Sequence, residues 1–276
     1  MVPVSYSPFV RNFRFPSLLR WTLAICAVVF TAPNVIAEPS ERPAYNNIRT
    51  VNRAFQIGER LQYAISWSNL LDAGTVVMEV KAGKTPEGKD SILFITTARS
   101  KGIVSTFYPV SDTVTSMVDG ESLCSIAYIF DQKHSNRKKQ RYLFFDQDAR
   151  KVRYIGDGTA GIFEVPYRIQ DALSSLYYLR TREDAKPGVP LHIDVFDSGK
   201  SWAVEIRIHG KERIKTDLGE FDTIKVSTYP KYEGVFQHKG EIIMWLTDDA
   251  RKVPVLMRSK ISIGSIVGTL TEMKER

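Results

Sequence analysis

Asp248 and Asp249 come nearest to a reactive pair in this sequence, because they are adjacent carboxylates that directly follow an apolar run. Two carboxylates can bind a metal ion, or they can divide acid and base roles where their surroundings separate their proton affinities. In the stretch WLTDDARKVPV (residues 245–255), apolar segments on both sides predict two strands, and Asp side chains can hold the turn between them. Pro254, which has no N–H to donate, suits the start of the returning strand. We therefore interpret the pair as part of a hairpin turn.

Two other stretches have the letters of a reactive motif, but the structure predicted around them does not suit that motif. The stretch DSGKS (residues 197–201) ends like a phosphate-binding loop, but the following SWAVEIRI alternates as a strand and does not open a helix. SNRK (residues 135–138) has the Ser-x-x-Lys spelling of penicillin-interacting enzymes, but it lies in a charged connection. The histidines lack metal-site spacing: His134, His192, His209 and His238. We predict no catalytic, cofactor-binding or metal-binding residue, which favours a protein that is not an enzyme, although a site assembled from distant strands stays open.

The N-terminus has the features of a secretory signal. Three arginines precede an apolar stretch, residues 21–32, and the sequence VIA at residues 35–37 offers the small residues that a signal peptidase accepts. The apolar run is interrupted by Pro33 and is shorter than the roughly 20 residues that span a bilayer. We expect a signal peptide of residues 1–37, cleaved after Ala37, and a periplasmic protein, with outer-membrane association left open.

The net charge bears on whether the mature chain binds nucleic acid, and the cysteine content bears on whether it forms disulfides. Removing residues 1–37 deletes three arginines and no acidic residue, so the formal charge falls from +7 to +4. This mild excess does not call for nucleic acid, and an exported protein rarely meets any. The mature chain keeps one cysteine, Cys124, and so forms no internal disulfide. Cys124 alternates with Tyr128 and Phe130 on one face of an expected strand, which is typical of a small core residue.

Period-two alternation dominates the chain after Phe55. In ERLQYAISW, Leu61, Tyr63, Ile65 and Trp67 share one face, as in a half-buried strand. The same signal recurs in SILFITTAR, LCSIAYIF, RYLFF, KVRYI, SWAVEIRI, GEIIMWL and SKISIGSIVGTL, separated by turn-forming pairs. The pattern predicts a mainly β protein, with an antiparallel curved sheet, barrel or sandwich of many short strands.

One helix and one domain are expected. The segment QDALSSLYYLRTR (residues 170–182) has apolar residues at helical spacing, with Asp171 near its start, where a carboxylate complements the helix dipole. The polar residues 38–54 lack apolar periodicity and indicate a flexible lead-in. No long linker divides the remainder, so residues 55–276 are expected to form a single β-rich domain.

Two groups of residues could contact a ligand or a surface. Trp67, Trp202 and Trp245 lie in expected strands and could line an apolar cavity, although aromatic residues also pack ordinary cores. The basic stretch KHSNRKKQR (residues 133–141) is expected at a hairpin tip. Its cations could protect a strand edge or bind anionic lipid headgroups weakly. The candidate surface contacts are Arg137, Lys138, Lys139 and Arg141.

The order of motifs along the chain resembles a known family. GERLQYAISW, YPVSDTV, DALSSLYYLR, GEFDTIKV and WLTDDARKVPV followed by IGSIVGTL are together similar to domain of unknown function 3108, over residues 55–272. The resemblance implies a signal-bearing, β-rich protein of the bacterial envelope. It implies no activity, ligand or catalytic residue.

Two classes of function follow from these observations. The favoured class is a non-enzymatic periplasmic or envelope-associated protein that binds an apolar or lipid-like ligand or an envelope partner. The alternative is a hydrolase or sugar-modifying enzyme that acts on cell-envelope material. A deep apolar hollow would favour the first class, and a cleft with clustered carboxylates would favour the second. No cofactor is expected under the favoured class, and the sequence leaves the oligomeric state open.

Overall fold

The computed structural model describes residues 50–276, apart from 136, 157, 233–234, 237–240, 262–263 and 275–276. The expected signal peptide, its cleavage site after Ala37 and the lead-in up to residue 49 lie outside the described residues. The end of the lead-in, by contrast, packs against the domain. Ala54 is buried, and the Asn52 side chain accepts hydrogen bonds from the backbone N–H groups of Ala54 and Phe55. Ala54 therefore packs in the core together with Phe55.

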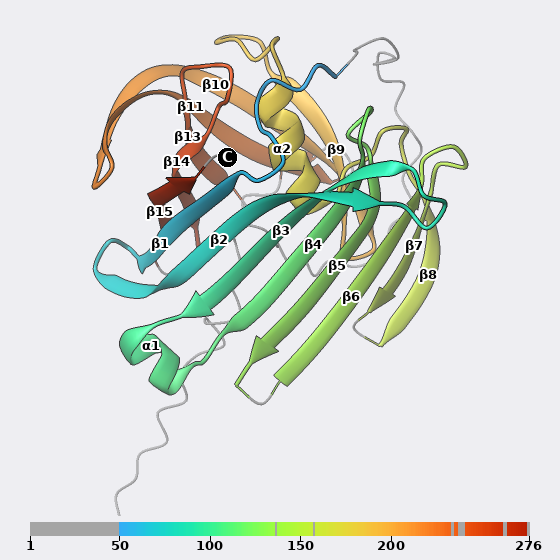
Figure 1. Ribbon diagram of the computed structural model, residues 1–276, viewed down its shortest axis with the longest axis horizontal. Coiled ribbons are helices and arrows are strands. Elements are labelled where there is room, and N and C mark those ends of the chain that lie inside the picture. Colours follow the sequence, from blue (N-terminus) through green and yellow to red (C-terminus); the bar gives the residue numbers. More distant parts are fainter. Residues whose placement is uncertain are drawn as a thin grey trace, which may run out of the picture.

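The fold is one antiparallel sheet in which nearly every strand pairs with its neighbour in sequence (Figure 1). Its order is β8-β7-β6-β5-β4-β3-β2-β1-β15-β14-β13-β11-β10-β9, and β12 pairs with β11. The strands are β1 (Arg60–Trp67), β2 (Leu71–Lys84), β3 (Asp90–Ser100), β4 (Ser111–Asp119), β5 (Ser125–His134), β6 (Arg137–Asp146), β7 (Lys151–Gly156), β8 (Thr159–Glu164), β9 (Leu191–Asp197), β10 (Lys200–Thr216), β11 (Gly219–Tyr232), β12 (Val235–Phe236), β13 (Ile242–Thr247), β14 (Pro254–Lys260) and β15 (Ser265–Lys274). The mainly β, curved antiparallel fold expected from the sequence is confirmed.

The two ends of the sheet overlap, so it is neither a closed barrel nor a two-sheet sandwich. Within the described residues, β8 pairs only with β7 and β9 pairs with β10. Phe196 of β9 packs against the rings of Phe145 and Phe163, with centroids 6.5 Å and 5.4 Å away. Because Phe145 belongs to β6, the end of β9 lies over the inner face of β6 to β8 and does not meet the β8 edge. The sheet is therefore coiled upon itself.

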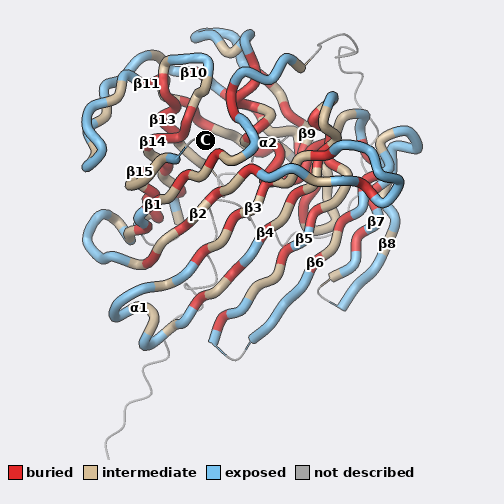
Figure 2. Tube along the Cα trace, in the orientation of Figure 1, coloured by how far each residue is buried: buried red, intermediate tan, exposed pale blue. Residues whose placement is uncertain are grey.

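The helix expected at residues 170–182 is present as α2 (Ala172–Thr181) and packs on the inner face of the sheet (Figures 1 and 2). Asp171 caps it by accepting hydrogen bonds from the backbone N–H groups of Leu173 and Ser174. Tyr177 stacks on Phe94 of β3, with ring centroids 3.8 Å apart, and Phe55 meets both rings edge to face. These aromatic contacts join the helix, the sheet and the first residues of the domain in one core.

A second helix, α1 (Gly102–Phe107), was not expected. Ile103, Val104 and Thr106 are β-branched, which lowers helix propensity, and no residue of α1 is buried. The segment is anchored by its flanking backbone, since the N–H of Lys101 donates to the carbonyl of Ala73 in β2. Among the described residues the fold thus has two helices, and the expectation of one was wrong.

Strand boundaries differ from the expectation at residues 259–270 and at Cys124, among other places. SKISIGSIVGTL, expected as one strand, is divided between β14 and β15, and Gly264 adopts a φ of 80° in the turn between them. A positive φ strains most other residues, so this glycine permits the reversal. Cys124 precedes β5 and does not belong to it, but it is buried as expected, and burial raises the pKa of its thiol.

Candidate functional site

Asp248 and Asp249 form the turn between β13 and β14, as expected. The Asp249 carboxylate accepts hydrogen bonds from the Thr247 hydroxyl and from the backbone N–H groups of Arg251 and Lys252. Asp248 points elsewhere and pairs with Lys211 of β10. The two carboxylates therefore have separate structural partners and do not act as one pair.

We predict that changing Asp248 to Asn and Asp249 to Ser together lowers the free energy of unfolding by about 1 kcal/mol, because one turn and one exposed ion pair are weakened. Chemical denaturation measures the loss. The single variant Asp248→Asn, which leaves the turn bonds in place, should cost less. A stably folded double variant that has lost all function in cells would contradict the structural role.

The basic stretch flanks the turn of the β5–β6 hairpin, and most of it lies in strand β6. His134 pairs with Arg137, and Lys133 pairs with Lys138 across the strands. Side chains alternate between the two faces of β6, so Lys138 projects from the outer face. Arg137 and Lys139 project from the opposite face, which is buried further along the strand. All three are exposed. They remain candidate surface contacts.

Arg141 must be removed from that group, because it is buried. Its guanidinium donates to the Ser198 hydroxyl at 2.7 Å, lies 3.5 Å from an Asp197 oxygen, and covers the Phe130 ring at 4.5 Å. These partners come from β5 and from the turn between β9 and β10. Arg141 therefore helps to hold the overlapping ends of the sheet together, and sequence alone could not distinguish it from its exposed neighbours.

The three tryptophans lie in three different settings and do not come together around one cavity. Trp202 is buried on the face of β10 that also carries the core residue Ile206. Trp245 lies on the opposite face of the sheet, where its indole N–H donates to Glu212 and Lys225 approaches its ring at 5.3 Å. Trp67 ends β1 and is exposed. Only Trp67 is placed to meet a partner.

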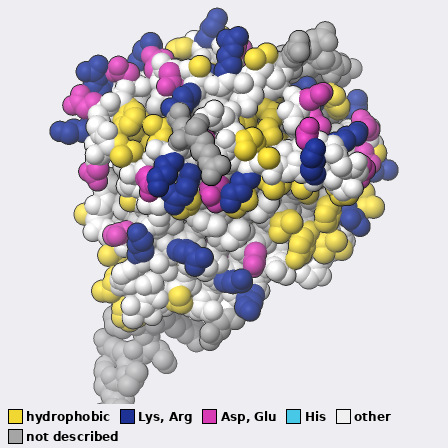
Figure 3. Space-filling model, viewed as in Figure 1, with side chains coloured by type: hydrophobic (Ala, Val, Ile, Leu, Met, Phe, Trp, Pro, Cys, Tyr) yellow, Lys and Arg dark blue, Asp and Glu magenta, His cyan; other side chains and the backbone are white. Residues whose placement is uncertain are grey.

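One end of the sheet gathers exposed apolar side chains from separate segments. This end, called here the hairpin end, consists of the β1–β2 turn, α1 and the β5–β6 turn, along the lower left edge of Figure 1. Leu70 is 87% exposed and Phe107 is 74% exposed. The apolar tips, as we call this set, are Trp67, Leu70, Leu71, Ile103 and Phe107. Figure 3 shows apolar side chains at the same edge, over α1.

Side-chain contacts link the segment that follows α1 and the start of β4 to the end of β5. His134 Nε2 lies 2.7 Å from an Asp112 carboxylate oxygen, and its Nδ1 lies 3.2 Å from the Tyr108 hydroxyl. When the ring is neutral and the Asp112 carboxylate is ionised, Nε2 donates to Asp112 and Nδ1 accepts from the Tyr108 hydroxyl. The backbone N–H of Ser135 also donates to the carbonyl of Pro109. Tyr108 and Asp112 belong to the stretch YPVSDTV. Their partner His134 lies on another strand, 22 residues from Asp112, so no local sequence pattern predicts the contact.

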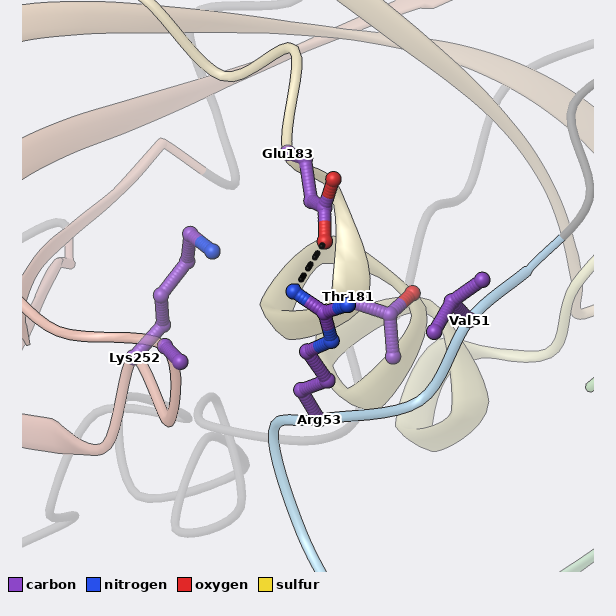
Figure 4. Close-up of a pocket in the computed structure, with 6 residues that line it drawn as sticks. Val51, Arg53, Thr181, Glu183 and Lys252 are labelled. Atoms are coloured by element: carbon purple, nitrogen blue, oxygen red, sulfur yellow. Dashed lines mark ion pairs between the residues drawn. The ribbon is translucent and has the colours of Figure 1, made fainter.

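A small pocket lies beside the C-terminal end of α2, where Arg53 and Glu183 approach to 3.8 Å (Figure 4). Its volume is about 210 Å³, and it is lined by Val51, Arg53, Thr181, Glu183, Ala250 and Lys252. Ligand pockets usually enclose about 300–1,000 Å³. Both charged side chains of the pair are exposed, so solvent weakens their attraction. The pocket is therefore smaller than a usual ligand pocket.

The described part of the chain, which omits His238, contains no group of three His, Cys, Asp or Glu side chains that could hold a metal ion. Neither α1 nor α2 is long and apolar enough to cross a membrane.

The coiled sheet around α2 defines a β-barrel-like protein, and a solved structure shares this fold. It is the crystal structure of a β-barrel-like protein of domain of unknown function DUF1849 from Brucella abortus, with a TM-score of 0.52 and 11% sequence identity over 79% of this chain and 97% of that chain. The chain itself belongs to the family described as protein of unknown function DUF3108, whose model matches residues 62–271. The family resemblance noted in the sequence is confirmed.

A second solved structure is more distant. It is a Bacteroides fragilis protein with a YmcC-like fold, with a TM-score of 0.33 and 9% identity over 80% of this chain and 98% of that chain, which is too low to assign a shared fold. No curated protein matches the sequence significantly.

Proposed function

We propose that this protein is a non-enzymatic protein of the bacterial cell envelope, exported by its N-terminal signal, that docks on an anionic membrane surface through the hairpin end. The observation that carries the proposal is the coincidence of two surfaces: the apolar tips and the exposed cations of β6 occur at the same end of the sheet. Scattered apolar residues are ordinary on a protein surface, but a cluster at the ends of separate segments is typical of an interaction site.

The apolar tips suit the boundary between lipid headgroups and acyl chains. Leu70 lies in the β1–β2 turn, and Phe107 is the last residue of α1. Both side chains are exposed, so they can enter a bilayer while the sheet stays folded. Complete burial of such a side chain contributes about 1.5–3 kcal/mol. Trp67 adds an amphipathic ring of the kind that gathers at membrane interfaces.

The cations supply the preference for anionic lipid. Arg137 and Lys138 begin β6, next to the segment that leads out of α1, since Ser135 bonds to Pro109 there. Clustered cations near an anionic surface contribute on the order of 1 kcal/mol each, and this attraction fades within a Debye length, about 10 Å at 0.1 M salt. The combined surface therefore predicts binding with an electrostatic part and an apolar part.

Vesicle flotation with the mature chain, expected to begin at Glu38, separates these two parts. We expect binding to vesicles that contain phosphatidylglycerol, weaker binding to phosphatidylcholine alone, and loss of most binding in high salt. Changing Arg137, Lys138 and Lys139 to Ser should remove the preference for anionic lipid. Changing Leu70 and Phe107 to Ser should weaken binding at every salt concentration, because the apolar contribution is not screened.

Matched controls lie away from the hairpin end. Lys89 precedes β3 and Lys151 is the first residue of β7, both at the ends of these strands far from the hairpin end, and Val189 and Leu218 are exposed apolar residues in other loops. Serine at these four positions should leave flotation unchanged. Wild-type protein that does not float at low salt, or variants of the hairpin end that float as well as wild type, would refute the proposal.

A further inference from the structure

A second exposed apolar surface covers the outer face of β5 to β8. Ile129 of β5 is opposite Tyr142 of β6, which is opposite Ile155 of β7. In the neighbouring row, Phe144 of β6 and Ile162 of β8 lie on either side of Arg153. The four exposed apolar residues, called here the outer patch, are Ile129, Phe144, Ile155 and Ile162. Figure 3 shows apolar side chains gathered over these strands, at the right of the view.

The outer patch reaches an open sheet edge. Strand β8 is the last in the order, and within the described residues it pairs with β7 alone. Because the end of β9 packs on the inner face, through Phe196 against Phe163, it does not cover the far edge of β8. The β8 sequence TAGIFE has no lysine, arginine or proline, and its register with β7 has no bulge. Apart from the exposed Glu164 at its end, β8 therefore lacks the usual features that keep an edge strand from pairing.

Two independent features, an apolar face and an unprotected edge, thus meet on one strand. Arg153, the cation within the patch, lies over the Phe144 ring at 4.7 Å, so its stem adds to the apolar surface. A partner that satisfies both features must supply a strand edge and an apolar face that continues the sheet. A second copy of the chain supplies both through its own β8.

We infer that two copies of this chain associate through their β8 strands, paired antiparallel about a twofold axis at Ile162. This register places the most exposed residue of the patch, Ile162 at 69%, against its copy, and it sets Glu164 opposite Ala160. A register centred on Glu164 would oppose two carboxylates, which is unfavourable. The two outer patches then form one continuous surface across the junction, and the pairing satisfies backbone groups of both edges. This interface is separate from the hairpin end.

Sedimentation velocity of the mature chain, from about 1 µM to about 200 µM, tests the inference, because this range brackets a micromolar dissociation constant. We expect a reversible shift from monomer to dimer. Ile162→Lys and Ile162→Glu should each raise the dimer dissociation constant by at least about tenfold, because like charges then meet at the axis. An equimolar mixture of these two variants should recover dimerisation, since opposite charges are then in contact.

Two further measurements make the result specific. The control Val189→Lys changes an exposed apolar residue in another loop and should dimerise as the wild type does. Hydrogen exchange of the peptide that contains residues 159–164 should slow as protein concentration rises, because edge amides become bonded. A wild type that stays monomeric throughout the range would overturn the inference, as would a dimer that persists unchanged in both Ile162 variants.

Discussion

Replacing Arg180 with alanine is expected to lower the free energy of unfolding by about 3–5 kcal/mol, the usual cost of removing one partner from a buried ion pair. Arg180 is buried in α2 and donates to both carboxylate oxygens of Glu59, at 2.7 Å and 2.8 Å. It also donates to the carbonyl groups of Ala54 and Arg251. The alanine variant leaves a buried carboxylate and two carbonyl groups without these donors.

Chemical denaturation of the variant measures this loss, and Arg53→Ala is its matched control. Arg53 also pairs with a glutamate near α2, but both side chains of that pair are exposed, so its removal should cost less than about 1 kcal/mol. Replacing Arg180 with Met and Glu59 with Leu together should restore part of the stability, because no unpaired charge remains. An Arg180 variant no less stable than the control would show that the buried pair contributes little.

Replacing Asp171 with alanine is expected to cost about 3 kcal/mol, which combines the loss of a helix cap with unsatisfied buried groups. Asp171 caps α2, and its second oxygen accepts hydrogen bonds from the hydroxyl groups of Ser116 and Ser125 at 2.6 Å and 2.8 Å. Asp171→Asn should cost less, because an amide oxygen still accepts from the backbone and serine oxygens can accept from its NH₂ group.

The same carboxyl group should make stability depend on pH. Burial raises the pKa of Asp171 above its ordinary value of 3.8, although the bonds from Ser116, Ser174 and Ser125 act in the opposite direction. Between 3.8 and the raised value, the folded protein keeps a proton that the unfolded chain has lost, so this group's contribution to stability falls as pH rises through that window. In denaturation experiments from pH 3.5 upward, the stability of the wild type relative to Asp171→Asn should fall as pH rises. Identical pH profiles would contradict the raised pKa.

The sequence by itself determined the local structure of the chain. Alternation of apolar and polar residues predicts most strands, because side chains of a strand project to opposite faces and one face is buried. The helix at residues 170–182 follows from apolar spacing and from Asp171 at its cap. The turn at Asp249 follows from the tendency of an aspartate to accept backbone N–H bonds. Each of these signals is contained within about ten residues.

Local patterns failed where packing decides between conformations. Helix α1 consists largely of residues with weak helix propensity, and it is anchored through the bond from Lys101 to Ala73 of another strand. The run SKISIGSIVGTL has the composition of one strand throughout, and among its described residues the positive φ at Gly264 marks the reversal. Arg141 and Lys139 belong to the same basic stretch, and Lys139 is exposed. Arg141 is nevertheless buried, because the turn at Ser198 covers it.

Only the tertiary structure decided how distant segments combine. Arg180 and Glu59 are 121 residues apart, and Arg251 comes from a third motif, so GERLQYAISW, DALSSLYYLR and WLTDDARKVPV meet at one buried guanidinium. The overlap of the sheet ends and the apolar tips of the hairpin end likewise arise from separate segments. Periodicity reports which face of an element is buried, but it contains no information about which other element covers that face, and this is why surfaces and buried pairs had to come from the fold.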